Sequence, residues 1–190
     1  MKSKIFIVLS SPSGGGKTTV AHHLMSIYPN AKFSISATTR SPRPNEIDGK
    51  DYYFLSKEEF LNKINNNELI EYEEIFGNYY GTLKSELDKA RIDNNILIFD
   101  VDVKGALSIK KLYPDESLLI FIAPPSLEIL EQRLINRNTE TDEQIKTRIN
   151  RAKMELDQAE KFDYVIVNDQ LQNTLDKVTE IAKKEIKELS

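Results

Sequence analysis

Residues 4–19 have the sequence KIFIVLSSPSGGGKTT. The continuous apolar run within residues 4–10 is typical of a strand that is buried on both faces of a parallel sheet. The glycines that follow leave the backbone open to an approaching anion. A helix expected over residues 17–28 adds free N–H groups and a positive dipole end. The stretch therefore predicts a strand, a phosphate-binding loop and a helix, in that order.

The loop predicts a nucleoside triphosphate site. In the pattern G-x-x-x-x-G-K-[ST], the lysine reaches the β- and γ-phosphates and the hydroxyl ligates Mg²⁺, and these residues are Lys17 and Thr18 here. Ser11 occupies the first glycine position, so a strict match fails, although the strand before the loop and the helix after it fit. The alternative is a flexible glycine turn, which leaves the Lys-Thr pair unexplained. The candidate ATP-binding residues of the loop are Ser11, Pro12, Ser13, Gly14, Gly15, Gly16, Lys17, Thr18 and Thr19.

Beyond the loop, strand and helix patterns alternate. Strands are expected at residues 97–101, 118–123 and 163–167, and helices at 103–112, 127–136, 142–160 and 171–188. Such alternation implies right-handed crossovers and a parallel sheet covered by helices on both faces. The predicted fold class is α/β: a P-loop parallel sheet covered by helices, with a small antiparallel insert and a mobile helical lid.

Two segments interrupt this alternation within one domain. Between residues 33 and 82 we expect short strands at 33–37, 52–55 and 69–75, and a helix with a capping box at Ser56 and Glu59. The polar residues 137–141 (RNTET) predict a hinge, after which Thr141 and Gln144 start a new helix by the same device. We assign the core to residues 1–32, 83–132 and 152–190, the insert to 33–82 and the lid to about 133–151.

Composition limits the class of protein. The chain has 190 residues, 39% hydrophobic and 29% charged, with a net charge of −4, which is typical of one globular domain and gives little support to non-specific nucleic-acid binding. It has no cysteine, which excludes disulfides and thiol chemistry. We see no signal peptide and no apolar stretch near the ~20 residues that span a bilayer. The expected location is the cytoplasm.

Six of the seven arginines fall in two places: Arg40 and Arg43 in the insert, and Arg133, Arg137, Arg148 and Arg151 around the hinge. Arginine suits planar, bidentate recognition of phosphate. Movable guanidinium groups that close over a transferring phosphoryl group stabilise its charge and exclude water. The alternative is ordinary ion pairing at the surface. The distribution favours phosphoryl transfer.

The insert combines residues that can hold a second nucleotide. Arginines with serine and tyrosine hydroxyls can bind a monophosphate, and Glu71 can accept hydrogen bonds from N1–H and the 2-amino group of guanine, which adenine lacks. The candidates are Ser36, Arg40, Arg43, Tyr52, Glu71, Tyr80 and Thr82. Each residue alone also has a structural interpretation, tyrosines in strands above all.

Several motifs together resemble the guanylate kinase family. Besides the loop, they are SATTRSPR at residues 36–43, GKDY at 49–52, GNYYGT at 77–82, DVDVKG at 100–105, RNTET at 137–141 and VIVND at 165–169. The match runs in order along essentially the whole chain. Two departures are Ser11, and Lys104 in place of a common glutamine.

The resemblance implies transfer of the ATP γ-phosphoryl group to GMP or dGMP with Mg²⁺, in purine nucleotide metabolism. It places Ser36, Arg40, Arg43, Tyr52 and Tyr80 at the GMP phosphate, Glu71, Thr82 and Asp100 at guanine, Arg133, Arg137 and Arg148 at the transferring phosphates, and Asn168 near adenine. Asp100 follows an apolar run and is suited to contact Mg²⁺ through water. Its alternative role is to cap the next helix, for which Asp102 is better placed.

Three other functions are alternatives for a chain with such a loop. A related kinase with another phosphorylated acceptor would alter the insert. A GTPase needs a motif such as N-K-x-D, which residues 168–171 (NDQL) lack. A phosphopeptide-binding scaffold domain loses the intact loop, whereas Lys17 and Thr18 are present here. The expected partners are small molecules, ATP and GMP or dGMP, with no nucleic acid and no membrane, and the sequence leaves a homo-oligomer open.

Overall fold

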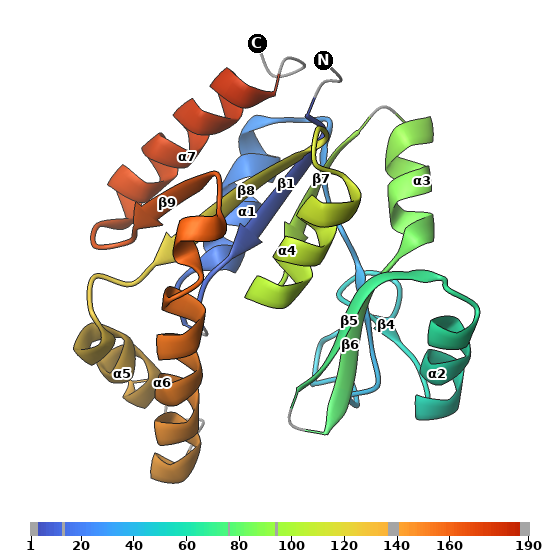
Figure 1. The fold of residues 1–190 in the computed structure, drawn as a ribbon, viewed down its shortest axis with the longest axis horizontal. Helices are drawn as coiled ribbons and strands as arrows, with labels where there is room; N and C mark the ends of the chain where they lie inside the picture. Colours follow the sequence, from blue (N-terminus) through green and yellow to red (C-terminus); the bar gives the residue numbers. More distant parts are fainter. Residues whose placement is uncertain (1–3, 13, 76, 94, 137–140, 187–190) are drawn as a thin grey trace.

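A computed structural model describes residues 4–12, 14–75, 77–93, 95–136 and 141–186. At its centre lies a parallel sheet whose described strands have the order β2-β7-β1-β8-β9 (Figure 1). These strands are β1 (Phe6–Ser10), β2 (Ala31–Phe33), β7 (Ile96–Asp100), β8 (Ser117–Ala123) and β9 (Tyr164–Val167). All four pairings between them are parallel, as the alternating pattern predicts.

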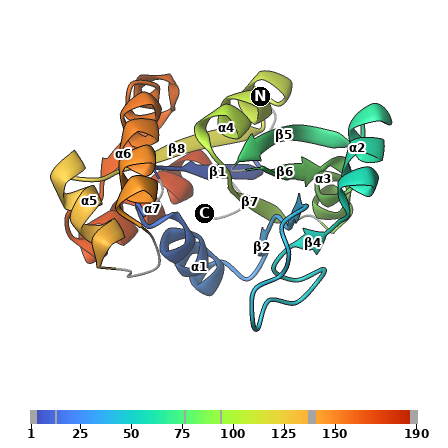
Figure 2. The ribbon, with the colours of Figure 1, turned by 90° about the horizontal axis from the view of Figure 1, so that it is seen from below.

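Helices cover both faces of this sheet. Ile7 and Leu9 of β1 pack on one face with α1 (Lys17–Ile27) and α7 (Leu171–Glu185). Phe6 and Val8 pack on the other face with α3 (Lys84–Ile92) and α4 (Val103–Leu112). Figure 2 shows α1 and α4 on opposite sides of β1. This double burial accounts for the continuous apolar run of β1, because neither face of the strand meets water.

A second sheet forms the insert, in the order β4-β3-β6-β5. Its strands are β3 (Ser36–Thr38), β4 (Tyr53–Phe54), β5 (Leu69–Ile75) and β6 (Asn78–Leu83), and the helix α2 (Lys57–Asn65) covers it with the buried Phe60. Figure 1 shows β4, β5 and β6 beside the core sheet. The expected capping box at Ser56 and Glu59 is present. Strands β3 and β5 run antiparallel to β6, whereas β3 and β4 are parallel. The predicted insert is therefore a mixed sheet that is mainly antiparallel.

The predicted single strand over residues 33–37 is wrong. Strand β2 belongs to the core sheet, and the Ser34 amide still donates to the Ile98 carbonyl at 2.8 Å. The chain then crosses to the insert and starts β3 at Ser36. Alternating apolar residues show that a segment is extended, but they do not show which sheet it joins.

The helices α5 (Leu127–Ile135) and α6 (Asp142–Leu156) lie on the side of the sheet away from the insert (Figure 1). They pack against each other through Leu130, Leu134, Ile145 and Ala152. The capping box at Thr141 and Gln144 is confirmed. Helix α6 ends four residues earlier than predicted, and a 3-10 turn, η1 (Ala159–Lys161), follows it. Across the described residues no helix is long and apolar enough to cross a membrane.

Candidate active site

The glycine loop connects β1 to α1 by a backbone path that requires glycine. Gly14 has φ +93° and Gly16 has φ +99°, both in the left-handed region that side chains disfavour. The Gly15 amide donates to the Pro12 carbonyl at 2.9 Å, which closes the turn. Gly16 is the N-cap of α1, so the unpaired N–H groups of the helix start open at the loop. Ser13 lies outside the described residues.

Lys17 and Thr18 face a carboxylate that β7 supplies. The Lys17 ammonium donates to the Ser11 carbonyl at 3.0 Å and lies 3.8 Å from Asp100 Oδ1. The Thr18 hydroxyl donates to Asp100 Oδ2 at 3.0 Å. The buried Ser11 hydroxyl donates to the Pro12 carbonyl at 2.9 Å and lies 3.2 Å from Lys17 Nζ. The serine at the first loop position therefore has hydrogen-bond partners inside the loop and leaves its path intact.

Asn168 supports the loop from behind. This side chain is buried; its Nδ2 donates to the Gly15 carbonyl at 2.9 Å, and its Oδ1 accepts from the Thr174 hydroxyl at 3.1 Å. Arg133 Nη2 donates to the Asn168 carbonyl at 2.9 Å. Both residues thus lie next to the loop, bound to its supporting structure. Their predicted contacts with adenine and with phosphates remain predictions.

Residues from the insert and the core line a cavity of about 110 Å³. Five of the eight predicted GMP-binding residues line it: Ser36, Tyr52, Glu71, Tyr80 and Asp100. Arg40 is next to it, with its guanidinium 5.4 Å from the Tyr52 ring centre and 2.9 Å from Glu46. This arginine holds the pKa of Glu46 below its ordinary value. Arg43 is exposed at the surface of the insert.

Glu71 carries the most distinctive chemistry of this cavity. The Thr82 hydroxyl donates to Glu71 Oε1 at 2.7 Å. Burial raises the pKa of the Glu71 carboxyl above its ordinary value, since removal from water disfavours the charged form. The bond from Thr82 and the packing around it fix an acceptor that can recognise two adjacent donors.

A second cavity, of about 280 Å³, joins three parts of the molecule. Ser11 and Lys17 come from the loop, Tyr80 from the insert and Arg148 from α6, and Asp100 of β7 also lines the cavity. Arg137 lies outside the described residues. The loop, the insert and an arginine of α6 therefore open onto one space.

Comparison with known proteins decides the family. The family model described as "Guanylate kinase" matches residues 3–185. The chain belongs to the guanylate kinase family. The guanylate kinase of Chlorobaculum tepidum is 51% identical over 179 residues, covering 93% of this chain and 91% of the relative. That of Chlorobium luteolum is 48% identical over 172 residues, covering 90% and 87%.

The fold agrees with this assignment. A crystal structure of guanylate kinase from Anaplasma phagocytophilum superposes with a TM-score of 0.76 at 33% identity, covering 98% of this chain and 88% of that one. The resemblance to the guanylate kinase family and the α/β fold class are thus confirmed, and the protein is a kinase of this family.

Gly105 of α4 lies against the candidate site, although the sequence analysis includes it only in a motif and assigns it no role. A Cβ at this position would lie 2.9 Å from Glu71 Oε2 and 3.2 Å from Asp102 Oδ1. The Gly105 amide also takes part in capping the helix, because it donates to Oδ1 of the N-cap residue Asp102 at 2.8 Å. A lone glycine inside a helical pattern often has a packing reason, and that signal was available in the sequence.

Proposed function

We propose that the protein transfers the γ-phosphoryl group of ATP to GMP and dGMP, forming ADP and GDP or dGDP. One observation carries the proposal: Lys17 of the loop and Tyr80 of the insert line the same 280 Å³ cavity. A donor phosphate on the loop and an acceptor phosphate at Tyr80 would meet there. The core, the insert (residues 33–82) and the lid (about 133–151) would each contribute one side of the site.

The loop would hold the donor. Its backbone N–H groups and the start of α1 would bind the phosphates of ATP, and Lys17 would reach the β- and γ-phosphates. Asn168 would approach adenine from its place behind Gly15. Such a site concentrates positive potential on the group that is transferred.

Thr18 and Asp100 fit a magnesium ion. Their oxygens lie 3.0 Å apart beside Lys17, and oxygen donors are what Mg²⁺ requires, with water and phosphate oxygens completing its shell. The ion would supply charge neutralisation between the β- and γ-phosphates when bound. Asp100 would also orient Lys17, which lies 3.8 Å from its carboxylate.

The insert would hold the acceptor. The hydroxyls and guanidiniums of Ser36, Arg40, Arg43, Tyr52 and Tyr80 would bind its phosphate, and Glu71, Thr82 and Asp100 would recognise guanine. The Tyr52 and Tyr80 rings lie 6.3 Å apart in an edge arrangement, so both belong to one wall. Glu71, already bound by Thr82, keeps Oε2 for the guanine N–H groups.

The transfer itself needs little acid–base chemistry. An ionised oxygen of the GMP phosphate forms the bond to the γ-phosphorus, while the bond from that phosphorus to the β–γ bridging oxygen breaks and leaves its electron pair on ADP. Positioning and charge neutralisation supply the rate. Arg133, Arg137 and Arg148 would close on the phosphates and exclude water.

A coupled assay with ATP and each nucleoside monophosphate tests this function. We expect rapid turnover of GMP and dGMP, and at least ~10²-fold lower kcat/KM with AMP and UMP, because neither base offers the guanine donors to Glu71. Equal turnover of AMP or UMP would contradict the assigned acceptor.

Replacing Gly105 with alanine is expected to raise KM for GMP about 10-fold. The new methyl carbon would lie 2.9 Å from Glu71 Oε2, which is too close, so the Glu71 carboxylate is displaced. The thermal midpoint should fall by only a few degrees, since the gain of about 0.5–1 kcal/mol from alanine in a helix offsets part of the overpacking cost of about 1–3 kcal/mol. Steady-state kinetics and a thermal scan measure both. Gly105→Ala made in a Glu71→Gln chain should change KM much less; an equal change would mean that the methyl group acts elsewhere.

A further inference from the structure

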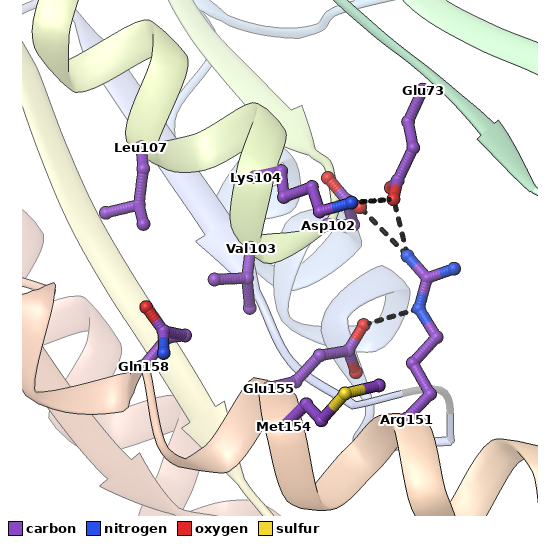
Figure 3. Close-up of a pocket in the computed structure, with 9 residues that line it drawn as sticks. All are labelled: Glu73, Asp102, Val103, Lys104, Leu107, Arg151, Met154, Glu155 and Gln158. Atoms are coloured by element: carbon purple, nitrogen blue, oxygen red, sulfur yellow. Dashed lines mark hydrogen bonds and ion pairs between the residues drawn. The ribbon is translucent and has the colours of Figure 1, made fainter.

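Arg151 of α6 ties three parts of the molecule together (Figure 3). Its Nη2 donates to Glu73 Oε2 of β5 at 3.0 Å and to Asp102 Oδ2 at 2.9 Å. Its Nε donates to Glu155 Oε1 of the same helix at 2.9 Å. We call Glu73, Asp102, Arg151 and Glu155 the latch. It links the insert, the start of α4 in the core, and α6.

The latch is sheltered enough to fix positions. The Glu73, Asp102 and Glu155 side chains are 16%, 17% and 13% exposed. Ion pairs of this kind are screened less by salt than exposed pairs. The planar guanidinium also sets direction, since it donates along fixed axes to separate carboxylates.

Lys104 now has a structural explanation. Its ammonium donates to Glu73 Oε1 at 2.9 Å, on the outer side of the latch, and its side chain is 80% exposed. The lysine adds positive charge where three latch carboxylates face one arginine. It contacts Glu73 from the core, and within the described residues it forms no hydrogen bond or ion pair with α6. It therefore provides a control that shares the carboxylate but does not reach the lid.

Each end of the latch reaches the site. Glu71 and Glu73 are two residues apart on β5, so they point to the same face, and both line the 110 Å³ cavity. Arg148 and Arg151 are three residues apart on α6, so they share a helix face, and both line the 280 Å³ cavity with Lys17. The latch therefore connects β5, which carries the residue assigned to guanine, with α6, which carries the arginine assigned to the phosphates.

We propose that Arg151 is a positioning residue that couples acceptor binding in the insert to the placement of Arg148 over the transferring phosphoryl group. The inference rests on the proposed function. Guanine bound at Glu71 fixes the position of β5. Glu73 on the same strand then holds Arg151, and α6 stays in place because it carries Arg151. Arg148 on this helix is thereby kept facing Lys17. Coupling of this kind is reciprocal, so the bound donor also strengthens acceptor binding.

A double-mutant cycle in the full chain tests the coupling. We expect Glu73→Ala and Arg151→Ala each to lower kcat with GMP by about 5- to 20-fold, a range typical of coupling between sites. The double variant should be no slower than the slower single variant, because both remove the same contact. Lys104→Ala should stay within about 2-fold of the wild-type chain, as expected for an exposed pair. Multiplicative losses in the double variant would overturn the latch.

Calorimetry distinguishes positioning from simple structural support. The Kd for GMP is measured with and without a non-hydrolysable ATP analogue. The wild-type chain should bind GMP more tightly with the analogue, and Arg151→Ala should bring the ratio of the two Kd values close to one. A variant that melts earlier but keeps both kcat and this ratio would show that the cluster only supports the fold. If the wild-type chain does not phosphorylate GMP, both the proposed function and the proposed coupling are wrong. If it phosphorylates GMP and Arg151→Ala leaves the ratio of the two Kd values unchanged, only the proposed coupling is wrong.

Discussion

Replacing Lys17 with alanine is expected to lower kcat for GMP phosphorylation by about 10²- to 10³-fold, the loss typical when one preorganised donor to a transition-state charge is removed. The ammonium lies 3.0 Å from the Ser11 carbonyl and 3.8 Å from Asp100, so these protein groups hold it at the mouth of the loop. A group held in advance needs no reorganisation during the reaction, and its loss acts mainly on kcat. Steady-state kinetics with saturating ATP measure it.

The matched control is Lys177→Ala, which removes the same charge from an exposed position on α7. It should leave kcat within about 2-fold, because exposed surface charges away from the site have small effects. Thermal scans of both variants should stay close to that of the wild-type chain. If the Lys17→Ala chain keeps most of its turnover, the loop does not take part in catalysis as proposed.

The loop, the capping boxes and the core strands other than β2 could be predicted because each is specified locally. Glycine at positions 14 and 16 permits the left-handed turns that the structure contains. Ser56 and Glu59 form their reciprocal bonds within one helical turn. Asp102, expected to cap α4, accepts from the Gly105 amide at 2.8 Å. No long-range information is needed for these features.

The remaining features depend on which segments meet. Residues 84–92 carry charged side chains on most positions and show no clear apolar stripe, so α3 was not predicted, although Leu87 and Ala90 are buried against the sheet. Arg151 was grouped with the other hinge arginines as a residue for phosphate. Its partner Glu73 lies 78 positions away in the sequence, and only the fold brings the two together.

Replacing Glu71 with glutamine is expected to lower kcat/KM for GMP by about 10²-fold. The glutamine side chain has nearly the same shape, but an NH₂ donor replaces one carboxylate oxygen and would face the N–H donors of guanine. The residue keeps a carbonyl for the Thr82 hydroxyl, which lies 2.7 Å from Glu71 Oε1, so the insert should keep its fold. Kinetics with GMP and AMP measure the change in selectivity. The low activity with AMP should not fall further; equal losses for both nucleotides would show that Glu71 supports the cavity rather than reads the base.

The pH dependence gives a second, independent test of Glu71. Burial raises the pKa of its carboxyl, so the native state binds this proton more tightly than the unfolded chain. The contribution of this proton to the free energy of unfolding is therefore complete below the ordinary glutamate pKa, and it is lost as pH rises through the raised value. Guanine binding changes with pH in the opposite direction, since only the ionised carboxylate accepts hydrogen bonds from both guanine donors. The KM for GMP should therefore rise as pH falls through the raised pKa. The GMP phosphate also titrates near pH 6, but it does so equally with Glu71→Gln. The wild-type to Glu71→Gln ratio of kcat/KM should thus increase with pH and then level off, whereas a ratio independent of pH would assign the base-reading carboxylate to another residue.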